Sequence, residues 1–61
     1  MNTYTFPKTE IEPILGHIYA YGFDIISMTL TDDIYTMTLN GTITEDEFEP
    51  LHNFHNLEIV T

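Results

Sequence analysis

The clearest alternation of apolar and polar residues lies in the middle of the chain. Between residues 26 and 39 the two kinds alternate on both sides of Asp32 and Asp33, and this period of two predicts two half-buried strands joined by a tight turn. If Thr31 faces Ile34 across the turn, large apolar side chains share one face of the hairpin and hydroxyl side chains share the other. The pairs expected on the apolar face are Leu30 with Tyr35, Met28 with Met37 and Ile26 with Leu39, and those on the other are Thr29 with Thr36 and Ser27 with Thr38. Because a two-residue type I′ turn needs positive φ at both positions, Asp-Asp also leaves a four-residue loop of the same register open.

The first part of the chain predicts a helix before this hairpin. Apolar residues recur at helical spacing from Ile11 to Ile18, and Thr9 with Glu12 has the spacing of a capping box at the helix start. Pro13 fits in the first turn, where a helix does not use the missing N–H. Gly22 lies where a glycine with positive φ would end the helix.

A second and weaker helix is predicted after the hairpin. Thr44 with Glu47 again has capping-box spacing, but a helix that began there would contain Pro50, which lacks an amide hydrogen. We therefore expect a turn through Glu45–Glu49 and a short helix over Pro50–Phe54.

Two short outer strands, over residues 3–6 and 57–60, complete the order β-α-β-β-α-β. The chain also resembles itself after 34 to 37 residues, because Glu10–Ile14 matches Glu47–Leu51 and Gly22–Ile26 matches Asn56–Val60. Two such halves predict an α+β protein with a compact ferredoxin-like fold, in which an antiparallel sheet of order 4-1-3-2 carries both helices on one face. The alternative is an α+β unit in which residues 3–6 do not pair.

Length and composition indicate a single folded domain over residues 1–61. A chain of this size buries only about 60% of the surface that its unfolded form exposes, so self-association would add useful stability. At 43% hydrophobic residues, with four Tyr and four Phe, the chain is too rich in core-forming side chains for a disordered acidic segment. It has no cysteine, no apolar run near the ~20 residues of a membrane span and no recognisable secretion signal. We expect a cytoplasmic protein that does not contact membranes.

Charge is the most unusual property of the sequence. Ten acidic residues face a single base, Lys8, which gives a formal net charge of −9. Residues 1–31 hold three of the acids together with Lys8, a sum of −2, and residues 32–61 hold the other seven. So much charge of one sign opposes compaction, and it excludes direct nucleic-acid binding because phosphates would be repelled. The charge therefore indicates a reason outside folding, which is either a solvated acidic surface that serves solubility or steering, or a partner with a basic surface.

The sequence offers little for catalysis or for a cofactor. Its carboxylates lie in predicted turns and helix starts rather than in buried pairs, and no glycine-rich phosphate loop is present. His52 and His55 are three residues apart and near Glu58, which are the ligand types of a metal site, but the same spacing is typical of a polar helix surface. The acidic stretch 45–49 does not match a calcium-binding loop. We expect a protein that is not an enzyme and that holds no metal or cofactor.

Threonines recur at alternate positions, and several of them would share the sheet face turned away from the helices. The pairs are Thr3 and Thr5, Thr29 and Thr31, Thr36 and Thr38, and Thr42 and Thr44. Threonine is a good former of solvent-facing strands, and this reading is favoured over the binding of ordered water or ice. Ile25, Ile34 and Val60 are expected on the same face, which leaves open the pairing of two copies through it.

In size and composition the chain resembles small acidic phage inhibitors that mimic DNA, such as anti-CRISPR and anti-restriction proteins. The resemblance rests on general character and not on a motif. It implies a non-enzymatic protein in the host cytoplasm that occupies the DNA- or RNA-binding surface of a host protein, since carboxylates can replace phosphates spaced by about 1.7 Å along a duplex.

The acidic residues expected to meet the partner are Asp32, Asp33, Glu45, Asp46, Glu47 and Glu49, together with Glu10 and Glu12. Phe48, which lies among these acids, is either an exposed apolar anchor or a core contact. The alternative function is a small homodimeric regulatory or structural module that uses its threonine-rich sheet face.

Overall fold

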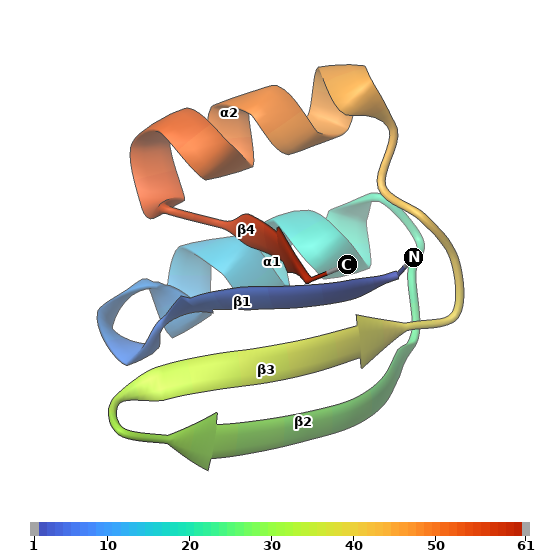
Figure 1. Cartoon of the computed structure of the whole chain (residues 1–61). Coiled ribbons are helices and arrows are strands. Elements are labelled where there is room, and N and C mark those ends of the chain that lie inside the picture. Colours follow the sequence, from blue (N-terminus) through green and yellow to red (C-terminus); the bar gives the residue numbers. More distant parts are fainter. Residues whose placement is uncertain (1, 61) are drawn as a thin grey trace.

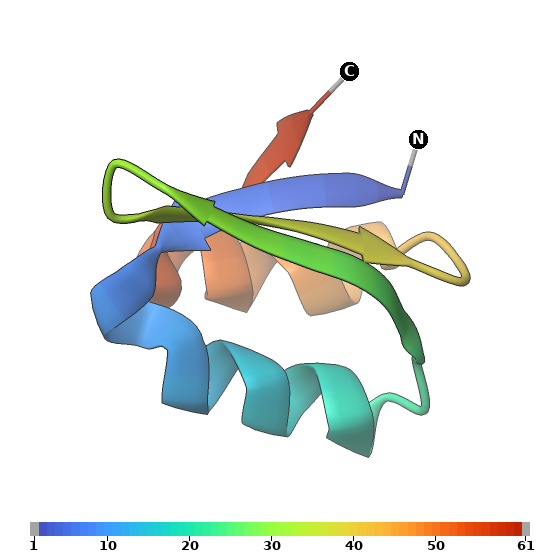
Figure 2. The same cartoon turned by 90° about the horizontal axis from the view of Figure 1, so that it is seen from below.

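In the computed structural model, residues 2–60 are described, and they form a four-stranded sheet with two helices. Along the chain the elements are β1 (Thr3–Pro7), a 3₁₀ turn η1 (Lys8–Glu10), α1 (Ile11–Ala20), β2 (Ile25–Thr31), β3 (Ile34–Leu39), α2 (Glu45–His55) and β4 (Glu58–Val60). The strands lie in the order β2-β3-β1-β4, and every neighbouring pair is antiparallel. Both helices lie on one face of the sheet (Figure 1 and Figure 2). The predicted α+β class, with one antiparallel sheet and two helices, is confirmed.

β1 lies inside the sheet, between β3 and β4. It pairs with β3 from Thr3 to Pro7 and with β4 from Thr3 to Thr5, so the alternative in which residues 3–6 do not pair is wrong. The alternation of side chains along β1 explains why this strand lies inside the sheet. Tyr4 and Phe6 are buried on the helix side, whereas Thr3 and Thr5, which alternate with them, are half-buried on the other face.

The core fills the space between the sheet and the helices. Its buried residues are Tyr4, Phe6, Ile14, Ile18, Met37, Leu39, Ile43, Leu51 and Leu57. The one hydroxyl in this set has a partner, because the backbone N–H of Ile43 donates a hydrogen bond of 3.0 Å to Oη of Tyr4. This bond ties the connection before α2 to the middle of the sheet.

The hairpin follows the predicted register over five pairs, from Thr31 with Ile34 to Ser27 with Thr38. The turn has two residues, and Asp32 (φ 52°) and Asp33 (φ 68°) both adopt the positive φ that a type I′ turn requires. The alternative four-residue loop is therefore excluded.

The sixth predicted pair is wrong because β2 contains a bulge. Ile25, and not Ile26, lies opposite Leu39, so Ile25 packs against the core and Ile26 is 65% exposed. Two hydrogen bonds anchor the start of β2: Asp24 N–H donates to Asn40 Oδ1, and Asn40 N–H donates to Asp24 O, each at 3.0 Å. With this end held, one extra residue bulges outward.

The predicted capping box at the start of α1 is wrong. Thr9 lies in η1 and donates a hydrogen bond of 3.5 Å to Glu10 Oε2, and the helix begins after Glu10 with no side-chain cap. The cause is a backbone bond of 2.9 Å from Lys8 N–H to Asp33 O, which holds the segment against the hairpin turn. Pro13 does lie in the first helical turn, as predicted.

The predicted end of α1 is confirmed. Gly22 has φ +87°, and the N–H groups of Gly22 and Phe23 donate to the carbonyls of Tyr19 and Ile18 at 3.1 and 3.2 Å. These two hydrogen bonds together form a Schellman motif, which needs a residue with positive φ after the helix.

α2 is longer than predicted, because it starts at Glu45 and runs without interruption through Pro50. The turn expected through Glu45–Glu49 is wrong, whereas the capping box of Thr44 and Glu47 is present in both directions. The cap starts the helix before the proline, and the missing amide hydrogen of Pro50 leaves only the carbonyl of Asp46 without its helical hydrogen bond. Asn56 in the left-handed conformation then ends α2 (φ 58°).

Candidate partner-binding surface

The acidic residues of interest lie at two ends of the molecule. Asp32 and Asp33 form the β2–β3 turn, at the same end as the start of α1, and α2 starts at the opposite end (Figure 1). We call Glu10, Glu12, Asp32 and Asp33 the turn cluster, and Glu45, Asp46, Glu47 and Glu49 the α2 cluster. The longest dimension of the fold is 28 Å, which limits their separation.

In the turn cluster, one aspartate is paired with the single lysine. Lys8 Nζ lies 3.1 Å from Asp33 Oδ1, and the two side chains are 52% and 78% exposed. Exposed pairs of this kind contribute roughly 0–1 kcal/mol, so the pair adds little to stability. It does neutralise one carboxylate and leaves Asp32 and Glu12 free at the same end, both exposed.

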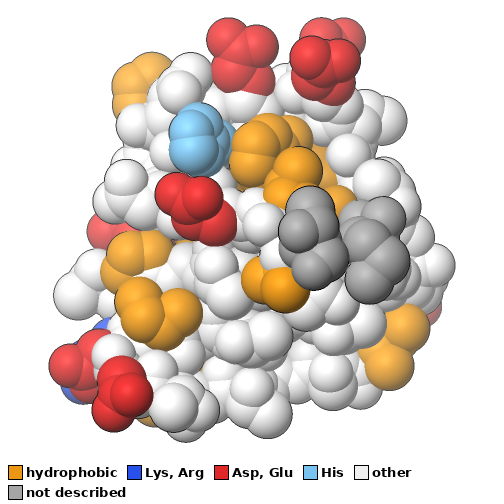
Figure 3. Space-filling view, in the orientation of Figure 1, with side chains coloured by type: hydrophobic (Ala, Val, Ile, Leu, Met, Phe, Trp, Pro, Cys, Tyr) orange, Lys and Arg blue, Asp and Glu red, His pale blue; other side chains and the backbone are white. Residues whose placement is uncertain are grey.

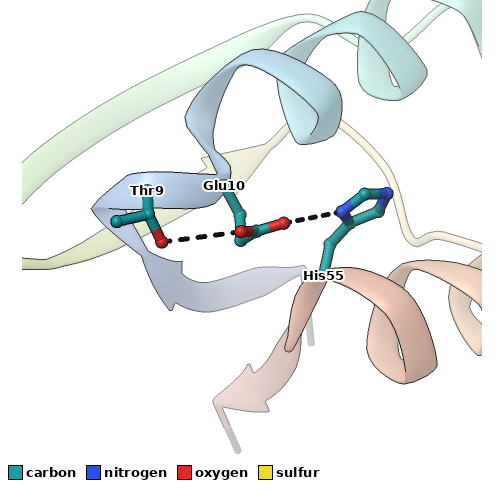
Figure 4. Close-up of polar contacts among 3 residues, drawn as sticks. All are labelled: Thr9, Glu10 and His55. Atoms are coloured by element: carbon teal, nitrogen blue, oxygen red, sulfur yellow. Dashed lines mark hydrogen bonds and ion pairs between the residues drawn. The ribbon is translucent and has the colours of Figure 1, made fainter.

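Glu10 is occupied within the fold. Its Oε1 accepts a hydrogen bond of 2.7 Å from His55 Nδ1, and its Oε2 accepts the bond from Thr9 (Figure 4). The His55 and Glu10 side chains are only 24% and 28% exposed. Because Glu10 precedes α1 and His55 lies in the last turn of α2, this pair joins the two helices. Glu10 is thus a structural residue first and a contact for a partner second.

The α2 cluster presents three of its four carboxylates to solvent. Glu45, Asp46 and Glu49 are exposed, and Figure 3 shows acidic side chains gathered along the upper edge over α2. Glu47 is half-buried, since its Oε1 accepts hydrogen bonds from Thr44 N–H at 3.3 Å and from Thr44 Oγ1 at 2.9 Å. Acids in the first turn of a helix also interact favourably with the helix dipole, so the cluster costs the fold little.

Phe48 belongs to the core, which decides between the two readings of this residue. It is half-buried, packs against the core, and its ring stacks on His52 with centroids 5.4 Å apart. The aromatic residue that sequence reasoning missed is Phe54, which is 76% exposed in the last turn of α2. The sequence predicted that Phe54 lies in this helix but not that it faces away from the core.

The histidines are engaged separately. His52 Nδ1 lies 2.8 Å from the carbonyl oxygen of Leu57, whereas His55 is bound to Glu10. The His17 ring lies 5.9 Å from that of His55. Within residues 2–60, no three side chains are placed to share a metal ion, and the surface forms no pocket.

The sheet face opposite the helices is almost free of charge. Register places two rows across it: Ser27, Thr38, Thr3 and Val60, and then Thr29, Thr36, Thr5 and Glu58. Figure 3 looks onto this face, and the lower central part of the view shows mostly side chains that are neither charged nor apolar. Ile34 and Val60 lie here as predicted, but Ile25 is displaced to the core side by the bulge. Carboxylates and hydroxyls thus occupy different parts of the surface.

Comparisons with protein-family models, with curated proteins and with solved structures gave no match. Among the described residues, no helix is long and apolar enough to span a bilayer.

Proposed function

We propose that this protein is a non-enzymatic inhibitor that presents carboxylates to the basic DNA- or RNA-binding surface of another protein. The observation that carries the proposal is the unbalanced charge. Of the ten acids, Asp33 is paired with Lys8 and Glu10 accepts a hydrogen bond from His55, which leaves eight carboxylates without either kind of partner among residues 2–60. Charge that the fold does not neutralise is available to a cationic partner, and it also steers association.

Exposure ranks the predicted contact residues. Asp32 and Glu12 at one end, with Glu45, Asp46 and Glu49 at the other, are exposed and free of ion pairs among the described residues. Glu47 and Glu10 have internal partners, so we assign them to positioning. A duplex carries one charge per about 1.7 Å, and two clusters within 28 Å fit a groove that follows such a backbone.

The proposed setting is that of phage proteins that counter host defence, acting in the host cytoplasm on a nuclease or a nucleic-acid-guided complex. The proposed fold is ferredoxin-like, and two observations support it. The element order is β-α-β-β-α-β with one short 3₁₀ turn, and the strand order, read from the β4 edge, is 4-1-3-2.

Charge-matched variants test the proposal. Glu45→Gln removes one charge from the α2 cluster, and Glu58→Gln removes one charge of the same kind at an exposed position outside both clusters. Immobilised protein should retain nucleic-acid-binding proteins from a bacterial lysate, release them as ionic strength rises, and lose them to added DNA or RNA. The first variant should weaken this retention several-fold more than the second. Equal weakening by both, or binding that neither salt nor nucleic acid reduces, would contradict mimicry.

A homodimeric module is the second candidate, and the composition of the open sheet face favours it. Thr3 Oγ1 and Thr38 Oγ1 lie 3.2 Å apart at its centre, and Glu58 is the one charged residue in its two rows. Two copies could therefore meet there with little repulsion. Thr36→Lys should dissociate such a dimer in sedimentation experiments, whereas Thr42→Lys in the loop before α2 should not. A wild-type protein that sediments as a monomer at all concentrations would exclude this candidate.

A further inference from the structure

The two edges of the sheet differ in length and in charge. β4 is a three-residue edge that includes Glu58, whereas β2 is a seven-residue edge, Ile25–Thr31, with no charged residue and no proline. Sheet edges expose unpaired backbone N–H and C=O groups, and proteins usually protect them with short strands, charges or proline. β2 has one such protection, the bulge at Ile26, and this leaves Ser27–Thr31 as a regular edge.

Apolar side chains are exposed along this edge. Ile26 is 65% exposed and Leu30 is 50% exposed, and Ile34, paired with the last residue of β2, is 41% exposed. An added strand would cover Leu30, which lies on the helix side of the sheet, and at the same time pair the free backbone groups. The edge thus combines main-chain and apolar binding, which is the combination used when proteins capture extended peptides.

Acidic residues flank the edge at both ends. Asp24 precedes β2 and Asp32 with Asp33 follows it, all three of them exposed. Two copies paired through a symmetric edge must run antiparallel, and full overlap of residues 25–31 would place Asp24 of one copy opposite Asp32 of the other. Like charges directly opposite one another are destabilising, so a second copy is a poor occupant. An occupant with basic residues at both ends has the complementary charge.

We propose that the β2 edge binds an extended segment of a protein partner, with an uncharged middle of alternating residues and Lys or Arg at both ends. The segment pairs antiparallel with Ser27–Thr31, its basic ends lie beside Asp24 and the Asp32–Asp33 turn, and its alternate side chains cover Leu30. This contact goes beyond mimicry, because it uses the backbone of β2 and none of the α2 cluster. The two proposals can therefore fail separately.

The test uses the whole protein and a synthetic peptide of the sequence Lys-Lys-Thr-Val-Thr-Val-Thr-Lys-Lys. At millimolar peptide, amide hydrogen exchange followed by NMR should slow about tenfold at the outward-facing amides of Ser27–Thr31, with no such change in α2. A peptide with glutamates in place of the lysines should have no effect, and neither should one with proline in place of the central threonine.

Several results would overturn the proposal. The lysine peptide could give no protection, or the proline or glutamate peptide could protect as well as it does. Protection could instead be centred on α2, or β2 could be protected without peptide to an extent that grows with protein concentration, which would identify a second copy as the occupant. The Glu45→Gln variant should still bind the lysine peptide. If the lysine peptide does not slow exchange in β2, while added DNA or RNA still displaces the retained proteins, only the edge-binding proposal is lost.

Discussion

The hydrogen bond between Tyr4 and the loop before α2 offers a direct test of what positions the acidic helix start. Tyr4 is 1% exposed and Ile43 is 5% exposed, and the Ile43 N–H has the Tyr4 hydroxyl as its acceptor at 3.0 Å. Tyr4→Phe keeps the ring in the core but removes this acceptor. A buried donor without a partner costs about 1–3 kcal/mol. At about 0.05–0.15 kcal/mol per residue, the whole domain has roughly 3–9 kcal/mol of stability, so the loss is a large part of the total.

Urea denaturation followed by circular dichroism measures this loss as a lower midpoint at unchanged slope. Tyr35→Phe is the control, because Tyr35 also packs against an aromatic ring, that of Phe6 at 5.4 Å, and its hydroxyl takes no part in the Ile43 contact. Exchange of the Ile43 amide hydrogen should accelerate in Tyr4→Phe and not in the control. Equal stability losses in the two variants, with Ile43 exchange unchanged, would refute the reasoning.

The remaining predictions concern the cap of α2 and two glycines in and after α1. Thr44→Ala should lower the free energy of unfolding by about 1 kcal/mol, because it removes the acceptor of the Glu47 N–H. The control Thr42→Ala should change the free energy of unfolding by less than about 0.5 kcal/mol. Equal denaturation midpoints in the two variants would contradict the cap. Gly16→Ala should raise the melting temperature, since an added Cβ at this exposed helical position meets nothing within 4 Å and alanine favours helix by about 1 kcal/mol. Gly22→Ala should lower it, because φ is +87° there and an L-residue is strained by roughly 1–2 kcal/mol; melting shifts of the same sign in both variants would be inconsistent with these backbone assignments.

Features that depend on near neighbours could be predicted from the sequence. The hairpin register follows from alternation on both sides of Asp32 and Asp33, and the capping box at Thr44 and the end of α1 at Gly22 each involve residues within one helical turn. In these places local geometry and burial favour the same conformation, so the pattern of residue types was sufficient.

The incorrect predictions share a different cause. The bulge at Ile26 follows bonds between Asp24 and Asn40, and the displaced start of α1 follows the bond from Lys8 to Asp33. Pro50 was judged from its own propensity, whereas a cap one turn earlier and the burial of Leu51 hold the helix together. In each case interactions with other residues overrode a local preference: contacts between distant residues did so at the bulge and at the start of α1, and the cap together with core packing did so at Pro50.

For the candidate surface, composition alone determined the net charge of −9, because ionisable side chains are counted without reference to the fold. The order of elements also placed acids at both ends. Only the tertiary structure decided which acids are free: His55 occupies Glu10 from 45 residues away, Phe48 packs inward, and Phe54 is left outside. Whether a side chain is free to meet a partner depends on contacts between residues that only folding brings together, and these contacts do not follow from the spacing of those residues in the sequence.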